Sequence, residues 1–191
     1  MKAISLVVLL MFVFSPSAFA QWKLIAEQSN INFVSIKKSK VGEVHSFTKL
    51  DGSIDESGAV EVKIGLGSVE TNIDIRNERM RTMLFETSKF MEAVVGGSVD
   101  VGRLSSLGVG ETYADSVKLM LSLHGVSGQV ASDVQVTKLS GDRILVSSLQ
   151  PIIISAEEYG LDKGVEMLRT VAKLPSISTA VPVTYSLMFG K

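Results

Sequence analysis

Three arginines lie among large apolar side chains between Ile75 and Phe85, and their chemistry gives the first indication of function. Arg76, Arg79 and Arg81 alternate there with methionine and leucine. A guanidinium group suits a carboxylate or a phosphate, whereas methionine and phenylalanine suit an adaptable apolar surface. The segment could therefore hold the charged head of an amphiphile whose tail lies elsewhere. It could equally be a surface helix with its apolar side on the core and its arginines in water.

The spacing of the arginines distinguishes them if the segment is an ideal helix. At about 100° per residue, Arg76 and Arg79 share a stripe with Met80 and Met83. Arg81 lies about 140° from Arg76 on the same helix. All three are head-group candidates, and we expect Arg76 and Arg79 to be the better ones. We expect Arg81 to fix the helix through an ion pair or carbonyl contacts.

Other residues capable of chemistry are few. The chain has no cysteine and only two histidines, His45 and His124, so no disulfide, metal site, cofactor or catalytic residue is predicted. His124 precedes a glycine and is expected in a turn, bonded to backbone; His45 could face either a cavity or water. Glu157 and Glu158 are adjacent, so their side chains would point apart and a solvated pair is expected. No nucleophile elbow, zinc-protease, P-loop or dinucleotide-binding motif is present.

The start of the chain has the pattern of a secretory signal peptide. Lys2 precedes an apolar run from Ile4 to Phe14, which is short for a membrane span, and an A-x-A cleavage pattern follows at 18–20. We therefore predict removal of residues 1–20 and one exported, periplasmic domain over residues 21–191. Without a later apolar run or a cysteine, no stable membrane anchor is expected.

The charge of the predicted mature chain limits its partners. Removal of Lys2 leaves 18 basic and 20 acidic residues, a net charge of −2. That balance gives no electrostatic footprint for nucleic acid. A homodimer is left open by the sequence.

Alternating apolar residues predict a β-rich domain. Segments 60–66, 117–123 and 183–189 have the period of two that marks strands with one buried face. Shorter strands are expected at 31–37, 44–50, 94–101, 130–137 and 144–148. Turn residues are found at Asp51-Gly52, Ser57-Gly58 and Ser140-Gly141-Asp142, while Gly96-Gly97 is either a turn or a bulge.

Two segments depart from the strand pattern and predict short helices, roughly 75–87 and 162–173. Many short antiparallel strands with two helices in one domain favour a closed barrel or a sandwich. Only 6% of the residues are aromatic, which disfavours the aromatic girdles of a membrane barrel and favours a barrel that holds a ligand.

Six blocks, taken in order, resemble the YceI family of exported polyisoprenoid-binding proteins. They are Ser29-x-Ile31-x-Phe33, Phe47 with Leu50-Asp51-Gly52-x-Ile54, Ser68-Val69-Glu70-Thr71, Arg76–Thr82 with Phe85, Leu123-His124-Gly125-Val126-Ser127 and Tyr159-Gly160-Leu161. The resemblance implies an all-β fold, an antiparallel eight-stranded lipocalin-like barrel with one or two short helices. It also implies an apolar tunnel that takes an isoprenoid chain.

Several positions depart from the family pattern. They are Lys37 for histidine, His45 for glycine, Asn77 for aspartate, Arg79 for histidine, Leu84 for aspartate and Ala156 for arginine. The polar residues around the expected tunnel mouth therefore differ from those of the family, which predicts a head-group preference different from that of the members that match the pattern better. The residues expected to line the tunnel are Phe33, Phe47, Met80, Met83, Phe85, Leu121 and Tyr159.

The leading prediction is a periplasmic carrier or binding protein for a long isoprenoid amphiphile, either a polyprenyl phosphate or an isoprenoid quinone. A cavity lined by aliphatic side chains and a few polar groups would suffice for such a ligand. Two alternatives remain. One is a hydrolase or isomerase acting on a lipid-like substrate, and the other is a protein-interaction module in envelope stress.

Overall fold

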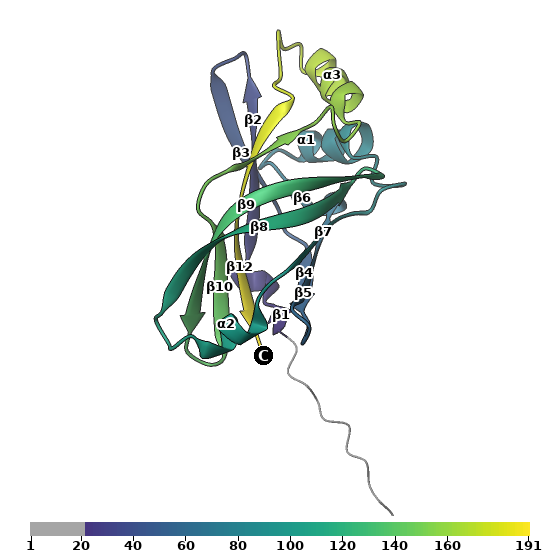
Figure 1. Cartoon of the computed structure of the whole chain (residues 1–191). Helices are drawn as coiled ribbons and strands as arrows, with labels where there is room; N and C mark the ends of the chain where they lie inside the picture. Colours follow the sequence, from purple (N-terminus) through teal and green to yellow (C-terminus); the bar gives the residue numbers. More distant parts are fainter. Residues whose placement is uncertain (1–21) are drawn as a thin grey trace, which may run out of the picture.

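The fold is described by a computed structural model for residues 22–191 (Figure 1). The predicted signal peptide, residues 1–20, lies outside these described residues. The strands are β1 (Trp22–Leu24), β2 (Asn30–Lys37), β3 (Val41–Phe47), β4 (Leu50–Ile54), β5 (Ala59–Gly65), β6 (Val69–Glu70), β7 (Glu92–Ser98), β8 (Thr112–Leu123), β9 (Val126–Leu139), β10 (Arg143–Ser148), β11 (Ile152–Ser155) and β12 (Ala180–Gly190). The helices are α1 (Asp74–Arg79), which continues as a π-helical turn over Met80–Leu84, α2 (Val101–Ser106) and α3 (Asp162–Val171).

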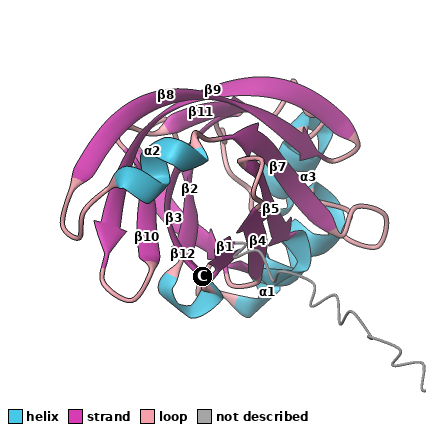
Figure 2. Cartoon of the chain, turned by 60° about the horizontal axis from the view of Figure 1, so that its bottom comes forward, coloured by secondary structure: helices cyan, strands magenta, loops and turns pink. Residues whose placement is uncertain are grey.

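Eight of the strands close into an antiparallel barrel. Their order is β1-β4-β5-β7-β8-β9-β10-β12, and β12 returns to β1 through the pairs Lys23↔Gly190 and Leu24↔Phe189. Figure 2 shows these strands curving around a common interior. The other four strands extend the sheet beyond the barrel: β2 pairs with β12, β3 with β2 and β6 with β3, while β11 pairs with β12. The predicted eight-stranded barrel is therefore confirmed.

The apolar positions that alternate in the sequence form the core inside the barrel. On β12, Leu187 and Phe189 are buried, and on β5, Val62 and Ile64 are buried. Each pair is separated by one residue, so both side chains point to the same face of the strand.

The prediction of a turn at Asp51-Gly52 is wrong, because both residues lie inside β4. Gly52 is needed there for close strand contact, since a Cβ at this position would lie 2.7 Å from the carbonyl oxygen of Glu61. Ser57-Gly58 does form a turn, with Gly58 at φ +86°. Gly96-Gly97 lies within β7, opposite Glu61 and Val60 of β5.

The helices lie at the two ends of the barrel. Helices α1 and α3 lie together at one end, and α2, which the sequence did not predict, lies at the other (Figure 1). Gly164 of α3 packs directly on the π-helical turn, where an added Cβ would lie 2.8 Å from Leu84 Cα. Within the described range, no helix has the length and apolar character needed to cross a membrane.

One pair of neighbouring barrel strands is hydrogen-bonded over only part of its length. Strands β7 and β8 share just three paired positions, from Val94↔Ser122 to Gly96↔Met120. Beyond them, β8 continues toward Thr112 paired with β9, while the chain after β7 enters α2. The barrel wall therefore opens between β7, α2 and the first half of β8.

Candidate functional site

The barrel encloses a cavity of about 290 Å³ whose walls are almost entirely apolar. Valine, leucine and isoleucine side chains from most of the barrel strands line it. Four of the residues predicted for the tunnel belong to this lining: Phe33, Phe47, Phe85 and Leu121. An apolar cavity inside a closed sheet can hold the tail of an amphiphile away from water.

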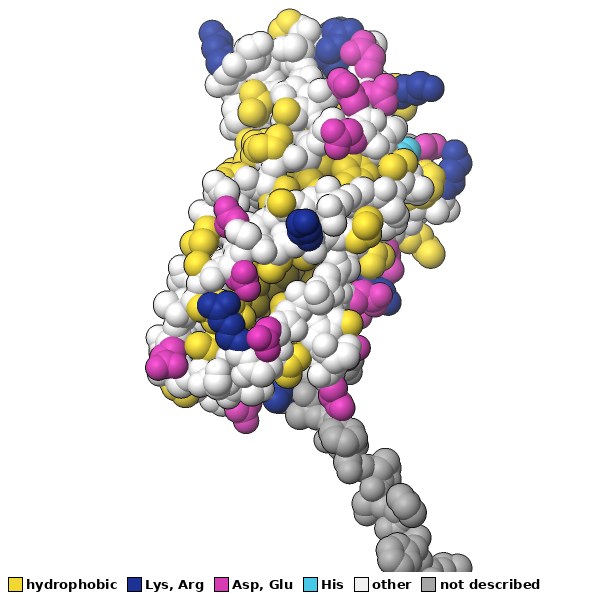
Figure 3. Space-filling model, viewed as in Figure 1, with side chains coloured by type: hydrophobic (Ala, Val, Ile, Leu, Met, Phe, Trp, Pro, Cys, Tyr) yellow, Lys and Arg dark blue, Asp and Glu magenta, His cyan; other side chains and the backbone are white. Residues whose placement is uncertain are grey.

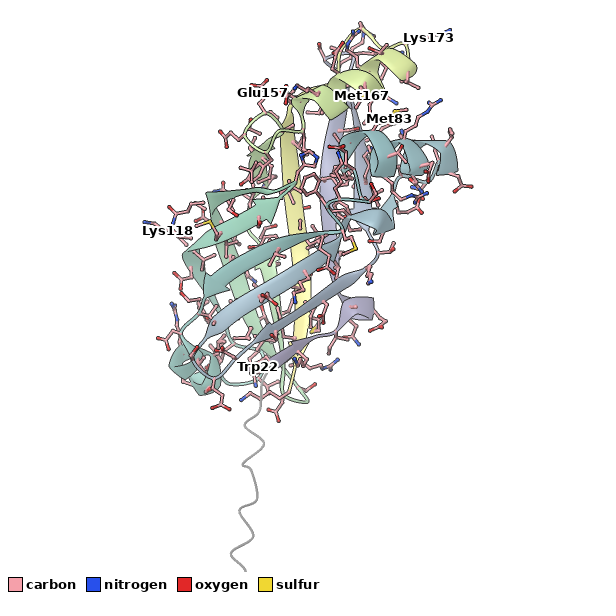
Figure 4. The ribbon with its side chains drawn as sticks, turned by 90° about the vertical axis from the view of Figure 1, so that its right-hand side faces the viewer. Trp22, Met83, Lys118, Glu157, Met167 and Lys173 are labelled. Carbon is pink, nitrogen blue, oxygen red and sulfur yellow. The ribbon has the colours of Figure 1, made fainter. Side chains whose placement is uncertain are left out.

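The other three residues predicted for the tunnel lie outside the lining. Met80 is buried in the core at the start of the π-helical turn. Met83 is half-buried near α3 (Figure 4), where its carbonyl oxygen would lie 2.7 Å from a Cβ at Gly164. Tyr159 is buried with its hydroxyl against Gly128 of β9.

The end of the cavity near α1 and α3 is closed by packed side chains. Leu84 ends the π-helical turn and Phe85 follows it, while Leu161 and Val165 come from the start of α3. All four line the cavity and none is more than 9% exposed. Phe85 also contacts Phe47, with their ring centroids 5.7 Å apart.

The opposite end, beside α2, is open and carries the polar part of the lining. Ser98, Asp100 and Asp115 line the cavity and are exposed. Figure 3 shows a hollow with an apolar floor in this part of the molecule, with acidic and basic side chains on its rim. The cavity therefore has one apolar closed end and one polar open end.

Helix α2 is fixed at this opening by Leu104 and by three contacts of Arg103. Leu104 is only 1% exposed and anchors the helix in the core. The backbone N–H of Arg103 donates to Asp100 Oδ1 over 3.0 Å, which caps the helix. The Arg103 guanidinium donates to Asp115 Oδ2 over 3.5 Å and lies 3.8 Å from the centroid of the Tyr113 ring.

The Tyr113 side chain lines the cavity and stays a neutral phenol at physiological pH. Burial raises its pKa from the ordinary value of 10.0, and the carboxylates of Asp115 and Asp100 raise it further, while Arg103 opposes them. Its hydroxyl can therefore act as a hydrogen-bond donor or acceptor.

Arg76, a predicted head-group ligand, is engaged in structural contacts outside the cavity lining. Its Nη1 donates to Glu43 over 2.7 Å and its Nη2 donates to the carbonyl oxygen of Thr71 over 2.6 Å. Glu43 also pairs with Lys37 over 2.7 Å. The hydrogen bond from Lys37, with the nearby charge of Arg76, holds the pKa of Glu43 below its usual 4.5.

The other two arginines also lie outside the lining. Arg81 pairs with Glu78 one turn earlier over 2.9 Å, which is the structural role expected for it. Arg79 is half-exposed at the end of α1. The structure therefore gives no support to a head-group site at Arg76, Arg79 and Arg81.

The residues at the opening were missed because α2 was missed. The available signal was Asp100, a favoured N-cap residue, shortly before a short apolar-polar run at 101–106. The partnership of Arg103 with Tyr113 and Asp115 depends on strand packing, which no local pattern gives.

The two histidines lie outside the cavity lining as well. His45 is 2% exposed, its Nε2 lies 3.0 Å from Ser35 Oγ, and burial lowers its pKa below 6.5. His124 lies in the predicted turn, but its Nε2 pairs with the Glu86 carboxylate over 3.1 Å instead of with backbone. Among the described residues, no group of three or more acidic, histidine or cysteine side chains could hold a metal ion.

Glu157 and Glu158 are both exposed, as predicted. Glu157 Oε1 accepts a hydrogen bond from Thr179 Oγ1 over 3.2 Å.

The sequence profile of the YceI-like domain matches residues 22–189. The chain belongs to the YceI family. Its barrel superposes on a polyisoprenoid binding domain from Saccharophagus degradans, implicated in plant cell wall breakdown, with a TM-score of 0.87 and 43% identity. That match covers 88% of this YceI chain and 97% of the other domain.

More distant solved structures share the fold of this YceI domain. BcnA of Burkholderia cenocepacia matches with a TM-score of 0.65 and 15% identity, over 86% of this chain and 98% of BcnA. The YceI protein of Campylobacter jejuni matches with a TM-score of 0.55 and 13% identity, over 75% and 82% of the two chains. No curated protein matches the sequence.

Proposed function

We propose that this YceI domain binds a long isoprenoid amphiphile with the tail inside the barrel, and that it serves as a periplasmic carrier or binding protein. The observation that carries the proposal is the apolar cavity, which is closed at one end by Leu84, Phe85, Leu161 and Val165. The description of the Saccharophagus domain as polyisoprenoid binding supports the same ligand class at 43% identity.

Apolar burial provides the affinity for such a ligand. Each 100 Å² of ligand surface removed from water contributes about 2.5 kcal/mol. A chain that threads the cavity would bury several such units, which offsets the loss of ligand freedom on binding. Few polar contacts are needed, in agreement with a lining whose polar groups are confined to Tyr185 and the open end.

A binding role fits the chemistry of the cavity better than an enzymatic role. Hydrolysis or isomerisation needs an acid or base within reach of the substrate. The lining of the described barrel contains neither His45 nor His124, and its only carboxylates, Asp100 and Asp115, are exposed at the opening. The ligand is expected to be held without chemical change.

Lipid extraction tests the proposal directly. The protein, purified from a cell envelope fraction, is extracted with organic solvent and the extract is analysed by mass spectrometry. We expect an isoprenoid species in about one copy per chain, and less in an Ala156→Phe variant, because Ala156 lines the cavity near its closed end. A wild-type protein that yields no isoprenoid, even after exposure to one, would overturn the proposal.

The predicted export is tested by fractionation. The mature chain is expected to begin at Gln21 and to be released with the periplasmic contents. Retention of residues 1–20 in the purified protein would contradict it.

A further inference from the structure

The charged residues that line the cavity are of one sign. Among residues 22–191, the charged members of the lining are Asp100 and Asp115, and both are at the open end. Asp100 begins α2, and Asp115 lies on the first half of β8, across the gap in the barrel wall. A ligand head at this opening therefore meets two carboxylates.

The cations near the opening do not reverse this charge. Arg103 is not part of the cavity lining, and its guanidinium already pairs with Asp115 and stacks on Tyr113. Lys118 is on β8 between two lining residues, so its side chain points to the outside of the barrel (Figure 4). Asp100 is left without a cationic partner among the described side chains.

The closed end offers no alternative position for a polar head. Leu84, Phe85, Leu161 and Val165 cover it, and the arginines of the α1 segment lie outside the lining. A polar head placed there would lose its water without gaining hydrogen bonds, which costs several kcal/mol. Tail-first insertion, with the head at the opening, is the arrangement that keeps the head hydrated.

We propose that the head group of the ligand lies at the opening formed by β7, α2 and β8, and that the two aspartates there select an uncharged polar head over a phosphorylated one. The proposal rests on the proposed binding of an isoprenoid amphiphile and adds the orientation and the head-group class. Tyr113 and the Arg103 guanidinium supply hydrogen-bonding groups to an uncharged oxygen, whereas a phosphate is repelled by Asp100 and Asp115.

Two probes with the same tail test this selection: geranylgeraniol, which is uncharged, and geranylgeranyl phosphate. The affinity of each probe is measured by its displacement of the uncharged fluorophore N-phenyl-1-naphthylamine from the protein, at probe concentrations below micelle formation. We expect the wild type to prefer the alcohol by about fivefold, the upper size of an exposed charge–charge interaction.

Variants that each remove one negative charge, two at the open end and one at the closed end, show whether the effect depends on the position of the charge. Asp115→Asn and Asp100→Asn should each reduce the preference for the alcohol over the phosphate by up to about fivefold. Asparagine is also an N-cap residue, so the second variant keeps the start of α2. The matched control is Glu157→Gln, an exposed carboxylate at the opposite end (Figure 4), which should leave both affinities unchanged.

Three results would overturn the proposal. The first is that the wild type binds the phosphate as tightly as the alcohol. The second is that the aspartate variants leave the preference unchanged, and the third is that Glu157→Gln changes the preference as much as they do. Failure of both probes to displace the fluorophore would instead contradict isoprenoid binding itself. Retained binding of the fluorophore itself in each variant shows that the barrel is folded.

Discussion

The buried side chain of Asn77 is expected to hold the closed end of the cavity in place. Its Oδ1 accepts hydrogen bonds from the backbone N–H of Thr71 over 2.8 Å and from Thr71 Oγ1 over 2.6 Å. Its Nδ2 donates to Glu70 Oε1 over 3.0 Å. Asn77 and Thr71 are 4% and 2% exposed, so water cannot replace the first two bonds without local opening.

Asn77→Ala should therefore lower the free energy of unfolding by about 2–3 kcal/mol. A buried donor left without a partner costs about 1–3 kcal/mol. Two donors lose their acceptor, but Thr71 Oγ1 keeps a 3.3 Å contact with the carbonyl oxygen of Ile73, which reduces the total. For a domain of this size the melting temperature should fall by roughly 5–10 °C.

Asn77→Asp is the matched variant, because a carboxylate keeps both acceptor contacts with Thr71. It loses the donor to Glu70 and places two carboxylates together. The Asn77 hydrogen bond now lowers the pKa of Glu70, so the variant should raise that pKa and be least stable at neutral pH. Its stability should recover, relative to wild type, as the pH falls and one carboxyl of the pair is protonated.

Urea unfolding followed by the fluorescence of Trp22, the only tryptophan, measures both variants. The reasoning is wrong if Asn77→Ala lowers the free energy of unfolding by less than about 1 kcal/mol, below the lower limit for one orphaned donor. It is also wrong if the alanine and aspartate variants show the same dependence on pH.

Three further changes test other parts of the structure. Burial favours the neutral form of His45, so as the pH decreases this histidine is protonated in the unfolded chain before it is protonated in the folded protein. The free energy of unfolding should therefore fall as the pH decreases from 6.5 toward the lowered pKa of the folded state. In urea unfolding, this decline should be absent in His45→Gln. Gly164→Ala should lower stability by about 1–3 kcal/mol despite the better helix propensity of alanine, because its Cβ would meet Leu84 Cα at 2.8 Å. Thermal melting measures this loss, and Gly67→Ala is the control because its Cβ would have no atom within 4 Å. Ala156→Phe should weaken geranylgeraniol binding at least tenfold in the displacement assay, as the ring replaces ligand contacts worth about 1.4 kcal/mol or more; unchanged affinity would place the tail elsewhere.

The long strands could be predicted from sequence because most residues on one face of each are apolar. In β8 and β12 the apolar residues alternate over many positions, which indicates a strand and does not fit the period of a helix. Helix α2 could not be found in this way, because it has only six residues and buries only Leu104. The opening between β7 and β8 depends on pairing between distant segments, which no local pattern contains.

The arginine segment shows where helical spacing fails. The predicted stripe of Arg76, Arg79, Met80 and Met83 assumes a regular α-helix. The chain instead changes at Met80 to a π-helical turn, in which the N–H of Phe85 donates to the carbonyl oxygen of Met80 over 2.9 Å. The longer turn delays the rotation of the chain, so Leu84 and Phe85 line the cavity and Met83 does not.

The two ends of the barrel differ in how easily they can move to admit a ligand. At the closed end, motion must break buried hydrogen bonds at Asn77 and separate Gly164 from Leu84, where the backbones are in contact. At the open end, the Arg103–Asp115 pair is exposed by 45% and 49% and its atoms are 3.5 Å apart. Such a pair contributes at most about 1 kcal/mol, so β8 and α2 can separate at little cost while Leu104 keeps the helix attached to the core. Ligand exchange should therefore take place beside α2, at the end of the barrel opposite the arginines.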